Sequence, residues 1–303
     1  MRSAWLLPAL ILASSARAEP IPVDDSYTVS RRYETYQAQY PELRVPVLRF
    51  ARGERMLVDR RYQRIGEREL HLDIFLPAPR RANRRAIMLV HGGGWRSGTK
   101  AEFYPLANLL AHRGYAVFLP EYRLSPEAGY PAGLDDLTAA MAWIRTNAAE
   151  YGVDPAQLSI GGGSSGGHLA ALLAYSAPSP PEALIDLDGV LDFTDPLALQ
   201  YENASASSAA VIWLGGTAEA LPDRWRAASP ASHVSASSPP TLIISSGQPR
   251  YTAGRERVLA ALDAAGIRNR YIQQERAPHT FWLFEPWLGP VAEEIDRFLR
   301  AVR

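Results

Sequence analysis

The sequence predicts an α/β protein with a mostly parallel central sheet and helices on both faces. Short, almost wholly apolar runs alternate with longer segments of helical periodicity from residue 86 to the C-terminal end. Glycine or proline stands at the ends of most of these runs. Strands that are apolar throughout are buried on both faces, which is typical of parallel sheets covered by crossover helices.

The individual elements follow from local patterns. YQRIG and ELHLDIFLP alternate apolar and polar residues around Gly66, which predicts an antiparallel hairpin at the start of the sheet. The expected buried strands are residues 86–93, 115–124, 158–163, 184–193, 240–247 and 268–275. The expected helices are residues 104–113, 134–152, 168–176, 255–265 and 291–302. No repeat and no second domain interrupts residues 59–303.

The N-terminal residues have the pattern of an export signal. Residues 1–18 contain an early arginine, an apolar run from Trp5 to Ala13, and an A-x-A site ending at Ala18. This run is shorter than the roughly 18 to 20 residues that span a bilayer. We therefore expect a cleaved signal peptide, a secreted or periplasmic protein without a membrane anchor, and an irregular arm over residues 19–58 that lies on the domain.

Composition excludes several classes of function. The chain has no cysteine, so disulfide bonds and thiolate chemistry are excluded. Its 32 basic and 32 acidic residues balance, which gives no indication of binding to nucleic acid or to an anionic membrane. No HExxH or similar ligand spacing predicts a metal, and no cofactor motif is present.

A glycine-rich stretch, SIGGGSSGGHLA, links a predicted strand to a predicted helix at residues 159–170. Glycines two residues before and after a serine allow the sharp G-x-S-x-G turn that exposes a nucleophilic hydroxyl. Both Ser164 and Ser165 fit this pattern, so spacing alone does not choose between them. A phosphate loop is disfavoured, because the only lysine, Lys100, is far away in the sequence.

A second glycine motif, HGGGW at residues 91–95, follows the first buried strand. Glycines at this position let backbone N–H groups approach a substrate oxygen, which is the requirement for half of an oxyanion hole. The other half is the N–H of the residue that follows the nucleophile.

These motifs, with EYRLSPEAGYPAGLDD at 121–136 and APHTFW at 277–282, resemble the α/β-hydrolase family. The resemblance is to hormone-sensitive-lipase-like and bacterial feruloyl-esterase-like (BD-FAE) serine esterases, and it runs from about Tyr62 to the C-terminus. It implies an α/β-hydrolase fold with Ser164 as the nucleophile and Gly93, Gly94 and Ser165 as oxyanion donors.

The catalytic base is predicted from chain order. In these hydrolases the order is serine, acid, histidine, and His279 follows the last predicted strand in a proline-containing loop. The acid is not where the resemblance implies it, since Arg250 stands at the expected aspartate position after the 240–247 strand. Asp192, at the end of the 184–193 strand, and Glu256, at the start of the following helix, are the two candidates that we expect to orient His279.

The substrate is predicted from segments that resemble exported bacterial carbohydrate esterases, among them WLGGT at 213–217 and HTFWLFEPWLGP at 279–290. This implies removal of acetyl or feruloyl groups from a plant polysaccharide such as pectin or xylan. Trp95 and Trp282 are candidates to contact substrate rings, and Arg250 or Arg255 is a candidate to bind a uronate carboxylate. A general small-ester carboxylesterase or lipase is the alternative, and an inactive binding protein with a hydrolase fold is the third possibility.

Overall fold

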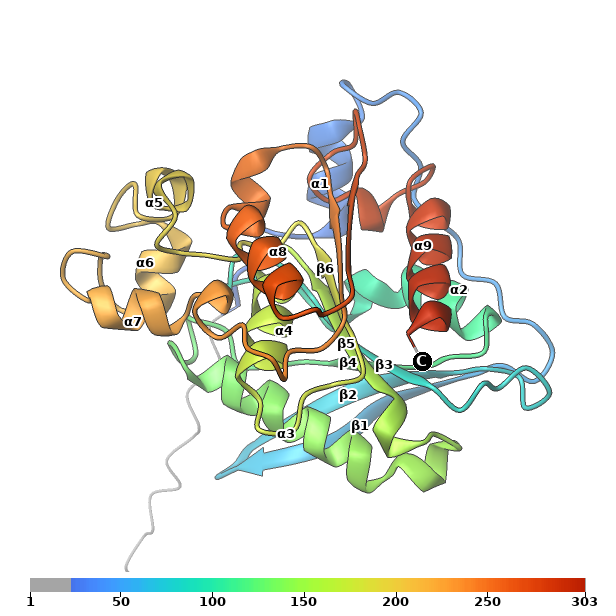
Figure 1. The fold of residues 1–303 in the computed structure, drawn as a ribbon. Coiled ribbons are helices and arrows are strands. Elements are labelled where there is room, and N and C mark those ends of the chain that lie inside the picture. Colours follow the sequence, from blue (N-terminus) through green and yellow to red (C-terminus); the bar gives the residue numbers. More distant parts are fainter. Residues whose placement is uncertain (1–22, 303) are drawn as a thin grey trace, which may run out of the picture.

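The computed structural model describes residues 23–302, so the predicted signal peptide lies outside the described residues. The described strands form one eight-stranded sheet in the order β1-β2-β4-β3-β5-β6-β7-β8 (Figure 1). The strands are β1 Arg55–Ile65, β2 Arg68–Leu76, β3 Ala86–Val90, β4 Ala116–Pro120, β5 Leu158–Gly163, β6 Leu184–Leu187, β7 Thr241–Ser245 and β8 Asn269–Gln273. The predicted α/β class with an N-terminal antiparallel hairpin is confirmed.

The direction of the strands agrees with the prediction. β1 and β2 pair antiparallel through a turn at Gly66, and β2 pairs antiparallel with β4. All other neighbours, from β4 through β8, pair in parallel. Because parallel strands end at one common edge, the loops after β3, β5, β6, β7 and β8 meet above that edge.

The helices of the described residues cover both faces of this sheet (Figure 1). They are α1 Val29–Tyr36, α2 Tyr104–His112, α3 Ala132–Thr146, α4 Ser165–Ser176, α5 Pro196–Glu202, α6 Ala209–Leu214, α7 Pro222–Ala227, α8 Arg255–Ala264 and α9 Leu288–Ala301. None of the helices in residues 23–302 is both long and apolar enough to cross a membrane.

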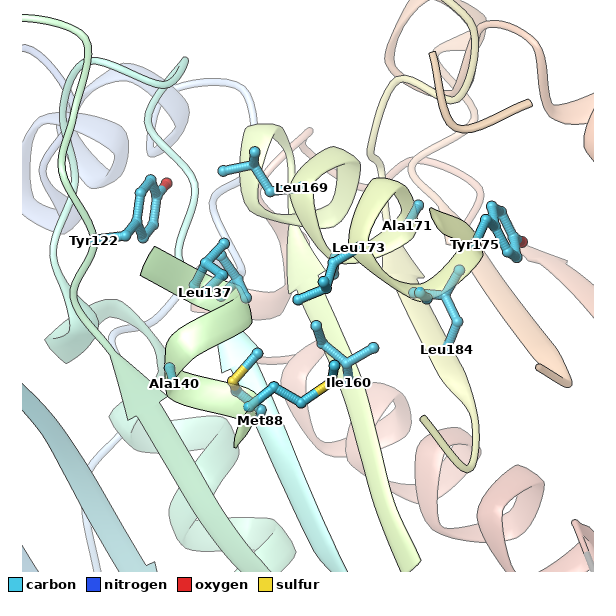
Figure 2. Close-up of a cluster of buried hydrophobic side chains, with 14 of the residues drawn as sticks. Met88, Tyr122, Leu137, Ala140, Ile160, Leu169, Ala171, Leu173, Tyr175 and Leu184 are labelled. Atoms are coloured by element: carbon cyan, nitrogen blue, oxygen red, sulfur yellow. The ribbon is translucent and has the colours of Figure 1, made fainter. Parts of the chain in front are cut away.

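Alternating side chains of the sheet divide the core into two layers. Met88 of β3 packs with Ile160 and with helices α3 and α4, and Figure 2 shows this cluster between helix and strand. Ile87 and Leu89, the neighbours of Met88, pack on the opposite face with α2 and α9. Successive strand residues point to opposite faces, so a strand apolar at every position needs cover on both sides.

Several predicted elements end a few residues from the observed bounds, and β1 begins at Arg55, inside the predicted arm. Three differences are larger. The strand expected at residues 184–193 ends at Leu187, and the residues after it form a turn. The segment between residues 195 and 228 contains the short helices α5, α6 and α7, for which the sequence analysis predicted no element. The arm contains α1, and Arg44 exchanges two backbone hydrogen bonds with Glu285, so the arm packs on the C-terminal part of the chain.

Candidate active site

Ser164 occupies a tight turn between β5 and α4. Its backbone has φ 55° and ψ −127°, a conformation that non-glycine residues rarely adopt. A Cβ atom on Gly162 would lie 2.3 Å from the carbonyl oxygen of Gly166, and one on Gly166 would lie 2.1 Å from that of Val90. The glycines are therefore required because backbone atoms fill the space around the turn.

The two adjacent serines have different surroundings. Ser164 is partly exposed, and its Oγ lies 2.9 Å from Nε2 of His279. Ser165 is 3% exposed, and its Oγ is buried without a hydrogen-bond partner among the described residues. Of the two hydroxyls, only that of Ser164 is accessible from solvent and lies beside a base. The structure therefore favours Ser164 over Ser165 as the candidate nucleophile, which the glycine spacing could not decide.

His279 lies in the loop after β8 and is held on both ring nitrogens. Nδ1 is 3.0 Å from Oδ2 of Asp188, and Nε2 is 2.9 Å from Ser164 Oγ. Burial lowers the pKa of His279, Asp188 acts in the opposite direction, and the charges of Arg250 and Arg32 lower the pKa further. A neutral imidazole that donates its Nδ1–H to Asp188 presents Nε2 as a proton acceptor to Ser164.

The carboxylate on His279 is Asp188, which the sequence analysis did not consider. β6 ends at Leu187, so Asp188 is the first residue beyond the strand at the edge where Ser164 and His279 also lie. Its backbone has φ 53°, and its Oδ1 accepts a hydrogen bond of 2.9 Å from the N–H of Ser246. The side chain is completely buried.

The prediction that Asp192 or Glu256 orients His279 is therefore wrong. Asp192 Oδ2 accepts a 2.6 Å hydrogen bond from Arg257, and its Oδ1 accepts two from Thr194. The side chain of Glu256 is 73% exposed and pairs with Arg255. The end of β6 at Leu187 is not recognisable in the sequence, because the apolar pattern continues to Phe193. Asp188 was therefore not identified as the first residue after the strand.

A second aspartate, Asp186, lies two residues earlier in β6. It is fully buried, and its Oδ1 accepts a hydrogen bond of 3.1 Å from the N–H of Gly189. Burial, followed by the charge of Asp188, raises the pKa of Asp186 well above its usual range. Through its hydrogen bond with Gly189, Asp186 supports the turn that carries Asp188.

The HGGGW loop lies against the nucleophile turn. A Cβ atom on Gly92 would be 2.8 Å from the Gly163 carbonyl oxygen and 3.2 Å from the Ser164 Cβ. The N–H groups of Gly93 and Gly94 donate to no other described residue. The N–H of Ser165 is at the first position of α4, where a helix leaves its N–H groups without an intrahelical partner.

The two tryptophans are core residues, and the prediction that they contact substrate is wrong. Trp95 is 4% exposed, stacks on Trp213 with ring centroids 5.2 Å apart, and donates a 3.1 Å hydrogen bond to His168. Trp282 is 1% exposed and lies edge-on to His279 at 5.6 Å between centroids. With so little of either ring exposed, neither offers a face to a sugar.

The two candidate arginines point to different places. Arg255 donates a 2.7 Å hydrogen bond to the hydroxyl of Tyr271 on β8, so the structure does not bring it to His279. Arg250 lies over the ring of Tyr251 at 4.2 Å, and Tyr251 is stacked on the imidazole of His279 with an interplanar angle of 8°. Tyr251 is a site residue that the sequence analysis missed, since an aromatic in a loop has no distinguishing local pattern.

Comparison with known proteins agrees with this fold and with these motifs. The BD-FAE family model matches residues 72–250, and the chain belongs to this family of α/β-hydrolases. Over 254 residues the chain is 30% identical to esterase LipQ of Mycobacterium tuberculosis, with 78% of this chain and 60% of LipQ covered. Carboxylesterase NlhH of the same species is 37% identical over 113 residues, which cover 37% of this chain and 35% of NlhH. The chain thus spans between about a third and three fifths of the length of these relatives.

Two solved structures share the architecture. Esterase 2 of Thermogutta terrifontis, determined with bound butyrate, superposes with a TM-score of 0.66 at 27% identity, covering 83% of this chain and 95% of that enzyme. A truncated carbohydrate esterase from gut microbiota superposes with a TM-score of 0.68 at 22% identity, covering 85% and 99%. The second likeness shows the shared fold.

Proposed function

We propose that this protein is a serine carboxylic ester hydrolase in which Ser164 is the nucleophile, His279 the general base and Asp188 the acid that orients His279. The observation that carries the proposal is the continuous chain of contacts from Ser164 Oγ through both nitrogens of His279 to Asp188 Oδ2. The order along the sequence, serine, aspartate and histidine, is the order of α/β-hydrolases.

The proposed mechanism assigns each proton transfer to one of these contacts. Ser164 Oγ attacks the ester carbonyl carbon while its proton passes to Nε2 of His279. When the tetrahedral intermediate collapses, the same proton passes from Nε2 to the oxygen of the leaving alcohol. Water then attacks the acyl group on Ser164 by the same route, and the acid is released. Asp188 holds the imidazole in the required tautomer and stabilises its charged form.

The oxyanion of the intermediate requires hydrogen-bond donors. The N–H groups of Gly93, Gly94 and Ser165 are the proposed donors, because they border Ser164 and none of them is committed to another described residue. Backbone donors fixed in place before the reaction stabilise the developing charge without a reorganisation cost.

The proposed substrate is an acylated carbohydrate, with acetyl or feruloyl groups on pectin or xylan as the leading examples. Support comes from the segments that resemble carbohydrate esterases and from Tyr201 of α5, which is 42% exposed beside Arg250. An exposed aromatic next to a guanidinium offers a ring face and a hydrogen-bond donor to a sugar. Small esters of simple alcohols are the alternative substrates. The third possibility, a binding protein without activity, was prompted by a missing acid, and Asp188 removes that reason.

Two assays test the proposal. The wild type is expected to hydrolyse p-nitrophenyl acetate, and Ser164→Ala is expected to lower kcat by at least about 10⁴-fold. Ser165→Ala is the matched comparison, because it alters the adjacent hydroxyl and retains the backbone N–H. Purified wild type without activity on any ester would contradict the proposal.

Acid release from acetylated pectin, acetylated xylan and feruloylated xylan then identifies the acyl group and polymer. Release from none of these polymers together with hydrolysis of small esters would favour the alternative. Export is a separate proposal that rests on the sequence of residues 1–18 alone. N-terminal sequencing of the protein recovered outside the cytoplasm tests it, and Glu19 is the expected first residue.

A further inference from the structure

The phenol ring of Tyr251 covers one face of the candidate base. Its centroid lies 3.3 Å from that of the His279 imidazole, and the two ring planes differ by 8°. This parallel contact is much closer than the 5.6 Å between the centroids of His279 and the edge-on indole of Trp282. Tyr251 and His279 come from the loops after β7 and β8, so the stack forms only when the sheet is assembled.

The two hydrogen bonds of His279 fix the place of its ring more firmly than the tilt of its plane. Nδ1 is bonded to Asp188 and Nε2 to Ser164, both at the edge of the ring. A hydrogen bond weakens steeply only when its angle falls below about 120°, and the terminal torsion of a histidine side chain has a broad minimum. A moderate tilt therefore costs little in hydrogen bonding, although it turns Nε2 away from Ser164 Oγ. A flat ring in contact with the imidazole face opposes that tilt by direct overlap.

The segment that carries Tyr251 is itself fixed. Tyr251 lies in the 3₁₀ helix Pro249–Thr252, and the next residue, Ala253, is 3% exposed. The carbonyl oxygen of Ala253 accepts hydrogen bonds of 2.9 and 3.0 Å from the N–H groups of Leu191 and Asp192. These two residues belong to the loop after β6 that also carries the triad carboxylate. The stacked ring and the carboxylate therefore share one backbone framework.

Arg250 holds the tyrosine ring by two contacts. Its guanidinium lies over the Tyr251 ring, 4.2 Å from the centroid, and its Nη2 donates a hydrogen bond to the Tyr251 hydroxyl. The same guanidinium lies 5.1 Å from the ring centroid of Tyr201 in α5. A continuous row of contacts thus leads from α5 to the imidazole, through Tyr201, Arg250, Tyr251 and His279.

The tyrosine has no direct part in proton transfer. Its hydroxyl is bonded to Arg250, and among the described residues it makes no hydrogen bond to Ser164 or His279. Burial raises the pKa of Tyr251, and the charge of Arg250 lowers it by a smaller amount, so the phenol is uncharged near neutral pH. The ring also tolerates the imidazolium that forms during the reaction, because the face of an aromatic ring attracts a cation.

We propose that Tyr251 is a positioning residue for ester hydrolysis, whose ring keeps Nε2 of His279 directed at Ser164 Oγ. Arg250 in turn keeps the ring of Tyr251 in place. The inference rests on the proposed function, and it adds to the triad a restraint that the hydrogen bonds of the imidazole do not supply. The flat ring is the part that acts on His279, whereas the hydroxyl serves to anchor the ring.

Two substitutions separate the ring from the hydroxyl. Tyr251→Leu removes the flat ring and retains an apolar side chain, so kcat on p-nitrophenyl acetate is expected to fall about tenfold or more, with KM changed by less than about twofold. Tyr251→Phe retains the ring and removes the hydroxyl, and it is expected to keep kcat within about threefold of the wild type. Activity that returns with the ring alone distinguishes positioning of the base from general support of the fold.

Tyr271→Leu is the matched control. Tyr271 also has a guanidinium over its ring, that of Arg255 at 4.1 Å from the centroid, and its hydroxyl accepts a 2.7 Å hydrogen bond from the same side chain. Both tyrosines are partly buried, but the ring that stacks on His279 is that of Tyr251. Tyr271→Leu therefore removes a comparable tyrosine and arginine pair, and it is expected to change kcat by less than about twofold.

The stack also has a spectroscopic signature that needs no substrate. Protons held over the face of an aromatic ring resonate upfield, so the carbon-bound imidazole protons of His279 are expected upfield in the wild type and in Tyr251→Phe. In Tyr251→Leu the same signals are expected to move downfield. Proton–carbon NMR of protein labelled with ¹³C-histidine measures these shifts, and the loss of one signal in His279→Gln assigns it.

The outcomes separate this proposal from the proposed ester hydrolysis. Wild-type kcat in Tyr251→Leu, or a loss in Tyr251→Phe as large as that in Tyr251→Leu, would overturn the positioning role. An identical His279 signal in the wild type and in Tyr251→Leu would also overturn it. A wild type that hydrolyses no ester would instead overturn the proposed function on which the inference rests.

Discussion

Two turns at the same edge of the sheet hold the candidate triad, and they are built in different ways. The turn after β5 is shaped by backbone contacts, since a Cβ on Gly162 or on Gly166 would overlap carbonyl oxygens. The turn after β6 is shaped by carboxyl groups: Asp186 accepts from the N–H of Gly189 and Asp188 accepts from that of Ser246. The first turn therefore depends on the absence of side chains, whereas the second depends on two ionisable ones.

Because of this difference, we expect the two turns to respond differently to a change of pH. Van der Waals overlap does not vary with pH, so the nucleophile turn is expected to keep its shape wherever the protein is folded. The acid turn includes a group whose pKa is raised and a second that orients His279, so its stability and its chemistry depend on protonation. Four measurements compare the turns directly.

The largest expected effect is on catalysis at the acid turn. Asp188→Asn retains the size of the side chain and removes the charge that fixes the imidazole tautomer, so kcat on p-nitrophenyl acetate is expected to fall by about 10³ to 10⁴-fold. Asp192→Asn is the matched control, four residues further in the same loop, and is expected to change kcat by less than about twofold because Asp192 contacts Arg257 instead. Equal losses in the two variants would mean that Asp188 has no special role.

The second effect is on the stability of the nucleophile turn. Gly162→Ala places a methyl group 2.3 Å from a backbone oxygen that no side-chain rotation can move, so the free energy of unfolding is expected to fall by about 3 kcal/mol or more. Gly66→Ala is the comparison, because Gly66 has a positive φ, which Gly162 does not, and has no atom within 4 Å of the added carbon. It is expected to cost about 1 kcal/mol, and urea unfolding of both variants measures the difference. A loss for Gly162→Ala no larger than that for Gly66→Ala would contradict close packing as the reason for the glycine at 162.

These two turns also show how far the sequence alone determines the site. The nucleophile turn is recognisable in the sequence because its requirement for glycine is local. The glycine spacing left Ser164 and Ser165 open, the family resemblance indicated Ser164, and chain order led to His279. The acid was missed because its identity depends on where β6 ends, and LIDLDGVLDF is apolar on both sides of that end. The mostly parallel character of the sheet was open to prediction from the alternation of strand and helix patterns, whereas the strand order was not predicted, and α1 and its contacts depend on tertiary packing of a weakly patterned arm.

The smallest effect concerns Asp186 and is a dependence on pH. Its pKa in the folded state is raised above the unfolded value, so the wild type loses stability as the pH rises from the unfolded pKa toward the folded one. Asp186→Asn keeps the hydrogen-bond acceptor and cannot ionise. Its Tm is expected to exceed that of the wild type by about 2–4 °C at pH 8, and the difference is expected to shrink toward pH 5. A Tm difference that does not grow between pH 5 and pH 8 would contradict a raised pKa of Asp186.

Covalent labelling with an aryl phosphonate fluoride, followed by peptide mass spectrometry, tests the candidate triad most directly, because it needs no knowledge of the substrate. The account predicts one phosphonyl group per chain, located on Ser164, with a labelling rate about 10³-fold lower in Asp188→Asn and unchanged in Asp192→Asn and Glu256→Gln. A label on Ser165, or a rate that is the same in Asp188→Asn as in the wild type, would contradict it.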